Sequence, residues 1–314
     1  MPDAPLAHVV RSGFVESVHH GSVVVLDAAG QVLAAAGDVT SPSFPRSSNK
    51  PLQTVGMLRA GLRTAEPADL ALISGSHFAE PFHVARTRRI LAAAGLDESA
   101  LRCPPSLPLS EAERDNVLRA GGGPVPVLMN CSGKHAGMLA TCVANRWSLE
   151  DYRDAKHPLQ VALAAAVSDL AGEPIAATGI DGCGAPVFAV SLTALARGFQ
   201  RLVDAPPRSF ERQVADAMRA DPELVAGTGQ DDTLLMRGVP GLLAKGGAEG
   251  VLAVAVEGVG AVAIKVADGG MRARMPVLVS ALRRLGISAP VLDQLATVPV
   301  LGGGDPVGEV RAAW

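Results

Sequence analysis

Residues 242–269 read LLAKGGAEGVLAVAVEGVGAVAIKVADG. Three runs of small and β-branched apolar residues are separated here by glycine-containing turns, a pattern typical of consecutive β-strands. Near the other end of the chain, VVVLDA at 23–28 and QVLAAAG at 31–37 flank a short turn and predict a hairpin. The patterns between about 81 and 225 are mainly helical. We therefore expect an α/β (α+β) fold, in which N- and C-terminal strands form one antiparallel sheet and a helical region is inserted between them.

The composition is that of a folded chain with a large core. Of the 314 residues, 48% are hydrophobic and 19% are charged, which excludes a disordered protein. We expect a single catalytic unit over 1–314, with a sheet subdomain at about 1–45 and 236–300 and a helical subdomain at about 46–235. Strands and helices do not alternate regularly, which argues against a Rossmann fold or a TIM barrel.

Charge and hydropathy exclude several classes of partner. The net charge is −3 and aromatic residues make up 3%, so neither a basic surface nor base-stacking platforms for nucleic acid are expected. The most apolar stretch, 251–266, carries two charges and is too short to span a bilayer. The first residues lack the pattern of a signal peptide, and four cysteines do not make a disulfide scaffold. We expect a cytoplasmic protein with reduced thiols and no membrane partner.

Lysine is rare in this chain and therefore informative where it occurs. Among 28 basic residues, only five are lysines: Lys50, Lys134, Lys156, Lys245 and Lys265. Unlike arginine, a buried lysine can lose its proton and act as a base or a ligand.

Two of these lysines lie in motifs that could activate a serine. Ser47 and Lys50 are three residues apart, so they share a face on the first turn of a helix. A neutral lysine can activate such a serine, as in the Ser-x-x-Lys motif of penicillin-recognising enzymes. Lys245 in AKGGAEG is similar to the Lys-Thr-Gly element of the same enzymes. The alternatives are a helix N-cap with a solvated lysine and a hairpin loop with an exposed one.

A further serine lies in a polar turn. The apolar run at 70–73, interpreted as a strand, leads into SGSHFAE at 74–80. A strand that ends in such a turn can expose Ser76 at a cleft. The alternative is a turn without a function.

Two cysteine motifs could hold a metal or a reactive thiol. In MNCSGKHAGM, Cys131 and Lys134 lie one turn apart at the start of an expected helix, where the helix dipole lowers a thiol pKa and favours anions. In GIDGCGAP, Asp181 and Cys183 point the same way if the segment is extended. Cys131 and Cys183 could pair as metal ligands or as a disulfide, or be buried structural residues. Cys103 and Cys142 are interpreted as structural.

The motifs together resemble a known family. In chain order they are PRSSNKPLQ, SGSHFAEPFHVART, NCSGKHAGML, GIDGCGAP, DPELVAGTG and AKGGAEG. Their content and order, over roughly residues 7–285, resemble the bacterial asparaginase II family, the Rhizobium-type (class 3) L-asparaginases. The resemblance implies a serine β-lactamase and glutaminase-like fold, an L-asparagine amidohydrolase that releases ammonia and L-aspartate, and a homodimer.

The resemblance also implies roles for particular residues. It gives two Ser–Lys tandems, Ser47 with Lys50 and Ser76 with Lys245. It gives a zinc site of Cys131, Lys134 and Cys183, and a substrate site that includes Arg46, Asp181 and His135. Ser47 is the preferred nucleophile with neutral Lys50 as its base, although the two serines could exchange roles. Ser76 and Lys245 would complete the proton relay, and the zinc ion would have a positioning role.

Three other functions stay open at this point. A glutaminase or another small-amide hydrolase would keep the same Ser–Lys chemistry. A non-catalytic amino-acid-binding homologue would keep the substrate site alone. A zinc-dependent hydrolase would use the metal and leave the serines structural.

Overall fold

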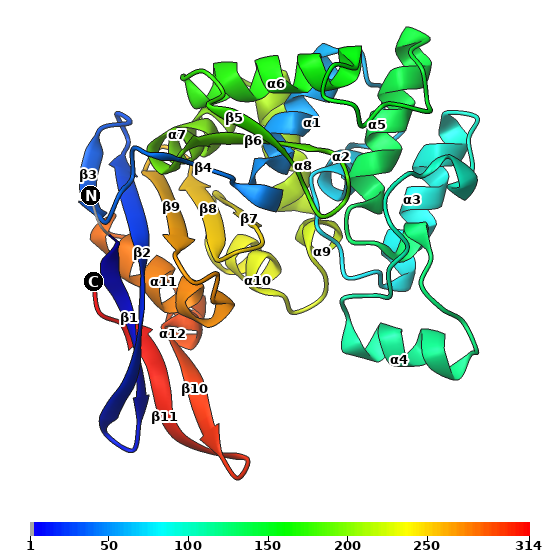
Figure 1. Ribbon diagram of the computed structural model, residues 1–314. Coiled ribbons are helices and arrows are strands. Elements are labelled where there is room, and N and C mark those ends of the chain that lie inside the picture. Colours follow the sequence, from blue (N-terminus) through cyan, green and yellow to red (C-terminus); the bar gives the residue numbers. More distant parts are fainter. Residues whose placement is uncertain (1–2) are drawn as a thin grey trace. The chain divides into compact units, whose positions relative to one another are not determined.

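The computed structural model describes residues 3–314, which divide into two compact units (Figure 1). Unit 1 contains the residues up to Ser48, Val190–Asp204 and Leu234–Trp314. Unit 2 contains Asn49–Ala189 and Ala205–Thr233. The chain therefore passes between the units four times, and neither unit is one continuous segment.

Unit 1 is built on an antiparallel sheet of strands from both chain ends. The strand order is β10-β11-β1-β2-β9-β8-β7, and β3 also pairs with β2. The strands are β1 (Ala4–Arg11), β2 (Phe14–Asp27), β3 (Val32–Ala36), β7 (Leu242–Gly246), β8 (Val251–Val256), β9 (Gly260–Val266), β10 (Thr297–Gly302) and β11 (Asp305–Ala312). The N-terminal and C-terminal strands meet where β2 pairs with β9, with Val23 opposite Ile264. This arrangement confirms the predicted fold class.

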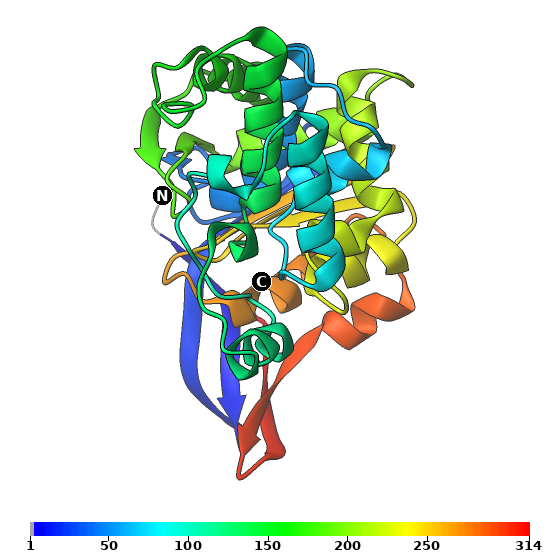
Figure 2. The ribbon, with the colours of Figure 1, turned by 90° about the vertical axis from the view of Figure 1, so that its right-hand side faces the viewer.

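Both faces of the central strands are covered, which explains their continuous apolar sequences. Every residue of β8 is buried, and β9 is buried except at Lys265. Helix α7 (Leu192–Val203) packs on β2, β8 and β9, and α11 (Arg274–Arg284) packs on β1, β9 and β11. Figure 2 shows the β1–β2 and β10–β11 turns at the same end of this sheet.

Unit 2 is a helical assembly. Its helices are α1 (Lys50–Arg59), α2 (Pro67–Ile73), α3 (Pro81–Ala93), α4 (Glu111–Arg119), α5 (Ser132–Asn145), α6 (Pro158–Ala171), α8 (Phe210–Ala220) and α9 (Pro222–Val225). Helix α1 packs against α6 and α8, α2 against α8 and α5, and α3 against α5. A hairpin of β5 (Ala177–Ile180) and β6 (Pro186–Ser191) follows α6, and the end of β6 pairs with β4 (Pro42–Ser43) in unit 1.

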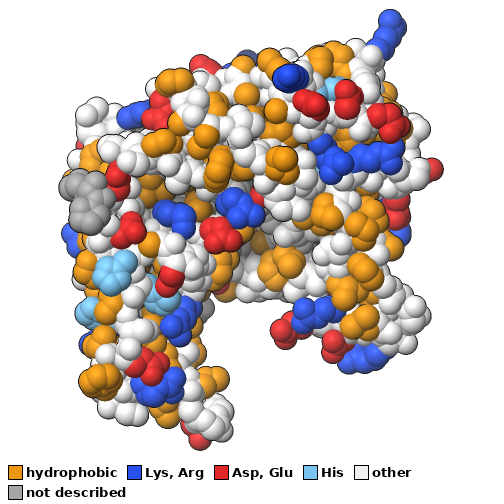
Figure 3. All heavy atoms as spheres, in the orientation of Figure 1, with side chains coloured by type: hydrophobic (Ala, Val, Ile, Leu, Met, Phe, Trp, Pro, Cys, Tyr) orange, Lys and Arg blue, Asp and Glu red, His pale blue; other side chains and the backbone are white. Residues whose placement is uncertain are grey.

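The remaining elements are short or join the two units. They are η1 (Arg46–Asn49), η2 (Glu98–Ala100), η3 (Pro126–Leu128), η4 (Met271–Ala273), α10 (Asp231–Gly238) and α12 (Pro290–Leu295). No helix among residues 3–314 has the length and apolar character needed to cross a membrane. On the face in Figure 3, acidic and basic side chains are interspersed.

Three features of the structure differ from the predictions made from the sequence. The run at 70–73 is the end of helix α2, not a strand, because Pro67 occupies its first turn and Glu66 and Asp69 form a reciprocal capping box. Residues 190–204 belong to unit 1 instead of the helical subdomain, because α7 packs on the sheet. The sheet also extends past the expected limit of 300, through β11 to Ala312.

Candidate active site

Lys50 is buried at the first residue of α1, where its side chain is surrounded by protein rather than solvent. Only 1% of its surface is exposed. The Lys50 Nζ atom donates hydrogen bonds to the Gly75 carbonyl oxygen at 2.5 Å and to Ser76 Oγ at 2.9 Å. A serine hydroxyl within hydrogen-bond distance of a lysine amine has the geometry required for proton transfer between them.

The backbone of residues 76–78 is held on two sides. The Ser76 and Phe78 amides donate to the Val225 and Ala226 carbonyls, at 2.7 and 2.9 Å, and the His77 amide donates to the Asn130 carbonyl at 3.0 Å. The preceding Gly75 allows this close approach, because a Cβ atom there would lie 2.8 Å from the carbonyl oxygens of Leu224 and Val225. Ser76 itself stays partly exposed at the end of this fixed segment.

Three of the expected site residues, Arg46, Ser47 and Lys245, belong to unit 1. Ser48 Oγ donates to the Lys245 carbonyl at 2.8 Å, which ties η1 to β7. Lys245 is buried, and its Nζ donates to the Gly246 carbonyl at 2.7 Å. Arg46 has a left-handed backbone, with φ 51°, and its guanidinium lies 3.6 Å from Glu249. Ser47 is half-buried.

The structure thus joins the lysine of one expected Ser–Lys tandem to the serine of the other. Lys50 and Ser76 are in contact within unit 2, whereas Ser47 and Lys245 are part of unit 1. The pairings of Ser47 with Lys50 and of Ser76 with Lys245 stay predictions.

The expected metal-site residues meet in the interior of unit 2. Lys134 Nζ donates to Cys183 Sγ at 3.2 Å, and the Cys131 thiol donates to Asn130 Oδ1 at 3.0 Å. The neighbouring Cys131, and then Lys134, hold the pKa of Cys183 far below its usual value, despite burial. The neighbouring Cys183 and burial raise the pKa of Cys131. Within residues 3–314 all four cysteines are free, so no disulfide joins these two.

His135 and Asp181 border this cluster. The Nδ1 atom of the buried His135 ring lies 2.6 Å from Tyr152 Oη. Burial lowers the pKa of His135 below its ordinary value, although Cys183 acts in the opposite direction. Its Nε2 atom is buried and has no partner of hydrogen-bond geometry among the residues of the described chain. Asp181 lies in the β5–β6 turn, where its carboxylate accepts the Gly182 amide at 2.8 Å. Burial lowers the pKa of Lys134, but Cys183, Cys131 and then Asp181 raise it above its usual value overall.

The donor set fits a zinc ion. Zn²⁺ binds thiolate sulfur and uncharged nitrogen, and Cys131, Lys134 and Cys183 supply two sulfurs and one amine, with Lys134 in contact with Cys183. Cys131 and Lys134 would release their protons when the ion binds. Among residues 3–314, at this cluster or elsewhere, no group of three or more His, Cys, Asp or Glu side chains is arranged to hold a metal. The expected set differs from such groups because one ligand is a lysine.

Three polar residues of the site, His77, Ser132 and Tyr152, were given no role by the sequence. His77 Nε2 lies 2.8 Å from Ser132 Oγ, and Tyr152 contacts both His135 and the Arg102 amide. His77 and Ser132 both lie inside motifs already quoted, so their positions in SGSH and NCSGKH were the available signal. What the sequence does not show is that these two side chains meet.

Comparisons with known proteins give the family. The family model described as L-asparaginase II matches residues 7–312. No curated protein matches the chain. Similar solved structures include Mglu in its native form, with 16% identity, a TM-score of 0.45 and coverage of 84% of this chain and 62% of Mglu.

Two other similar structures cover most of both chains. A β-lactamase from Mycobacterium bovis has 16% identity and a TM-score of 0.46, with coverage of 85% of this chain and 95% of that protein. A mutant of simvastatin synthase from Aspergillus terreus has 11% identity and a TM-score of 0.40, with coverage of 88% and 90%. The chain spans less than two thirds of the length of Mglu.

Proposed function

Because the chain belongs to the L-asparaginase II family, we propose that it hydrolyses the side-chain amide of L-asparagine to L-aspartate and ammonia. Family membership supports an amide hydrolase that acts on a small molecule; the choice of asparagine rests on the sequence motifs. The observation that carries the proposal is the buried Lys50, whose amine donates to Ser76 Oγ at 2.9 Å.

The proposed reaction runs through an acyl-enzyme. A serine Oγ attacks the side-chain carbonyl carbon while a neutral lysine accepts the hydroxyl proton. The C–N bond then breaks, the lysine returns the proton to the departing nitrogen, and ammonia leaves. Water, deprotonated by the same lysine, splits the resulting ester and releases aspartate. The resemblance assigns the attack to Ser47 with Lys50 as base; the hydrogen bond of Lys50 to Ser76 supports a route by which Ser76 passes the proton to the leaving group.

The substrate is a zwitterion and needs two opposite charges for its recognition. We assign its ammonium group to Asp181 and its carboxylate to Arg46, whose planar guanidinium suits a bidentate contact. Arg46 now lies near the largely exposed Glu249, which the substrate carboxylate would replace as its partner. Lys245 completes the proton relay in this assignment, and His135 borders the substrate site.

Cys131, Lys134 and Cys183 would hold the zinc ion. When bound, the ion supplies a fixed positive charge that orients groups around it. The residues themselves keep the start of α5 attached to the β5–β6 turn, which carries Asp181. A homodimer and a cytoplasmic location, expected from the motifs and the sequence, belong to this proposal as well.

Ammonia release is the direct test. The zinc-loaded wild type, Ser47→Ala and Ser76→Ala are compared with L-asparagine and L-glutamine as substrates. We expect turnover of asparagine by the wild type and a loss in both variants, and trapping of an acyl-enzyme identifies the attacking serine. A faster reaction with glutamine would favour the glutaminase alternative, since a single methylene changes discrimination by only about 1–3 kcal/mol.

Other outcomes would remove the proposal. Activity in both serine variants that disappears on chelation would support a zinc-dependent hydrolase. A wild type that binds asparagine but releases no ammonia would support an amino-acid-binding protein.

A further inference from the structure

We propose that His77 is a positioning residue for Ser76: its neutral imidazole, protonated at Nε2, ties the Ser76 segment to the first residue of α5. The inference rests on the proposed function in that it assumes Ser76 takes part in the reaction. His77 does not contact Lys50 or Ser76 through its ring in this scheme; it acts through the backbone that places Ser76.

The hydrogen bonds of His77 determine which nitrogen carries its proton. The Ala79 amide donates to His77 Nδ1 at 3.1 Å, and a backbone amide can only donate, so Nδ1 is unprotonated. The proton of the neutral ring is therefore on Nε2, which lies 2.8 Å from Ser132 Oγ. The ring is fully buried, and burial, together with His83 and Lys50, lowers its pKa well below the usual value.

The Ser132 hydroxyl oxygen can accept the hydrogen bond from His77 Nε2. Its single hydroxyl hydrogen is donated to the Val127 carbonyl at 2.8 Å, which leaves the oxygen free to accept from His77. Ser132 is the first residue of α5, directly after Cys131 and two residues before Lys134. The His77–Ser132 bond therefore connects the serine segment to the helix that carries two of the expected zinc ligands.

A second buried histidine fixes the opposite side of the segment in the same way. His83 accepts the Glu80 amide at Nδ1 (3.1 Å) and donates from Nε2 to the Glu223 carbonyl at 2.8 Å. Its ring stacks on His77, with centroids 5.1 Å apart. Glu223 belongs to α9, and the carbonyls that follow it, Val225 and Ala226, accept the amides of Ser76 and Phe78.

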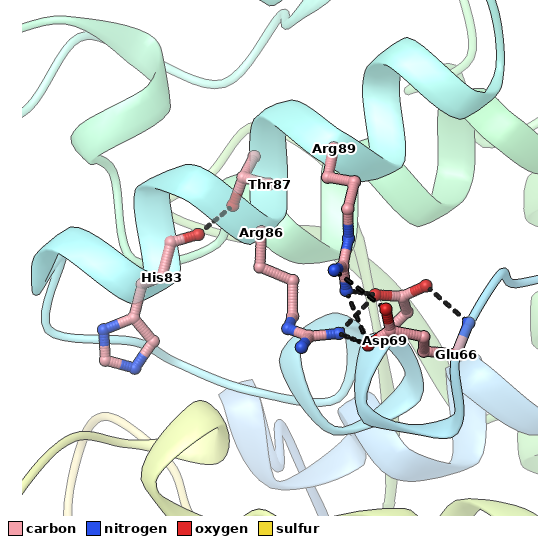
Figure 4. A network of polar contacts seen from close by, with 6 residues as sticks. All are labelled: Glu66, Asp69, His83, Arg86, Thr87 and Arg89. Atoms are coloured by element: carbon pink, nitrogen blue, oxygen red, sulfur yellow. Dashed lines mark hydrogen bonds and ion pairs between the residues drawn. The ribbon is translucent and has the colours of Figure 1, made fainter.

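Helix α3, which carries His83, is itself anchored. Arg86 and Arg89 on this helix pair with Glu66 and Asp69 at the start of α2, as Figure 4 shows. In the same view Thr87 donates to the His83 carbonyl. The imidazoles thus bridge elements that are already fixed, and the Ser76, His77 and Phe78 amides are hydrogen-bonded to carbonyls of the same neighbouring segments. This arrangement holds Ser76 Oγ at its 2.9 Å distance from Lys50 Nζ.

Two substitutions at position 77 distinguish a positioning role of His77 from a general effect on folding. In His77→Asn, the short amide can still accept the Ala79 amide but cannot reach Ser132. In His77→Gln, the longer amide can reach Ser132 with an N–H donor but does not reproduce the Nδ1 acceptor. Ser132→Ala removes the acceptor and leaves the imidazole. His157→Asn is the matched control, because His157 is also buried and caps α6 by accepting the Leu159 amide at Nδ1.

The readouts are kcat and KM for ammonia release from L-asparagine, and the imidazole ¹⁵N shifts of His77, assigned by their loss in the variants. We expect kcat to fall about 10- to 100-fold in His77→Asn and Ser132→Ala, with KM changed by less than about threefold, because small displacements of a reacting group cost such factors. His77→Gln should retain more activity than His77→Asn, and His157→Asn should match the wild type. The wild-type shifts should show the Nε2–H tautomer, and Ser132→Ala should move them.

Folded His77→Asn and Ser132→Ala proteins with wild-type kcat would overturn the proposal, as would an Nδ1–H tautomer in the wild type. If the wild type releases no ammonia, the proposed function fails. The tautomer and its response to Ser132→Ala then decide separately whether His77 fixes the Ser76 segment.

Discussion

Lys50 is the residue on which the proposed chemistry depends most directly. Its two hydrogen-bond acceptors are the Gly75 carbonyl and Ser76 Oγ. Arginine in its place could also donate these hydrogen bonds but could not lose a proton near neutral pH. We therefore expect Lys50→Arg to lower kcat by about 10²–10⁴-fold, the range typical of a general base. Ammonia release measures this, with the exposed Lys156→Arg as control; a Lys50→Arg enzyme of wild-type rate would exclude Lys50 as the base.

The cysteines make a second prediction at the scale of single residues. If Cys131 and Cys183 are zinc ligands, replacing either with alanine should weaken zinc binding at least about tenfold, because the remaining donors leave the ion incompletely coordinated. Cys142→Ala is the control, since Cys142 is also buried but lies elsewhere on α5. Elemental analysis after dialysis against a competing chelator measures retained zinc. Equal retention by all three variants would contradict the assignment.

The contact between α2 and α5 depends on a glycine. A Cβ atom on Gly133 would lie 2.7 Å from Leu72 Cγ and 2.8 Å from the Leu72 carbonyl oxygen, and the backbone oxygen cannot move away as a side chain can. We expect Gly133→Ala to destabilise the protein by about 1–3 kcal/mol, since the cost of overpacking exceeds the gain in helix propensity. Thermal unfolding measures the change.

The matched control for this substitution is Gly123→Ala. A Cβ atom on Gly123 meets nothing within 4 Å. Its melting temperature should stay at the wild-type value. A Gly133→Ala protein as stable as this control would show that α2 and α5 can separate without cost.

Elements with a strong local pattern were predictable, and elements fixed by tertiary packing were not. The continuous apolar runs of β8 and β9 identified the sheet, because strands covered on both faces are apolar throughout. The outer strand β10 is mostly exposed, so its sequence carries no comparable apolar run. The run at 70–73 was misassigned because short apolar segments suit strands and helices equally, and here the capping residues Glu66 and Asp69 decide.

The candidate site was likewise predictable in part: its residues could be identified from the sequence, but their contacts could not. The motifs identified Lys50, Ser76, Cys131, Lys134 and Cys183 as candidates. In the structure Lys134 contacts Cys183, because the start of α5 and the β5–β6 turn meet in unit 2, whereas a zinc site at these residues stays a prediction. The contact of Lys50 with Ser76 was not predicted. It depends on how closely Gly75 approaches α9, and this distance is set by packing between segments far apart in the sequence.

At the scale of the whole molecule, the chain connectivity limits how the protein can be divided. The chain passes between the units after Ser48, Ala189, Asp204 and Thr233. Helix α7 lies between two segments of the helical unit in the sequence but belongs to the sheet unit. Both chain ends supply strands of the sheet, so deleting either end would remove strands and not a separate domain. The full chain is therefore the unit for every experiment above.

Stability of the whole molecule should fall as the solution becomes mildly acidic. Burial lowers the pKa of His77 and His83 below their ordinary value of 6.5, so the folded protein keeps both rings neutral. The unfolded chain takes up protons as the pH falls through about 6.5, and the folded chain does not, which favours unfolding. The contribution of these rings is thus complete above about pH 6.5 and is lost progressively below it.

The acidic side chains contribute to stability over a different pH range from these two histidines. The carboxylates with lowered pKa values, such as Glu66 and Asp97, lose their contribution only at lower pH, below their ordinary values near 4. Melting temperatures at about pH 7.5 and pH 5.5 should therefore differ through histidines and not through carboxylates. In His77→Asn the melting temperature should be lower at pH 7.5, because hydrogen bonds are lost, but its fall towards pH 5.5 should be smaller than in the wild type. An equal fall in both proteins would mean that His77 is already able to take up a proton in the folded chain, in conflict with its two fixed hydrogen bonds.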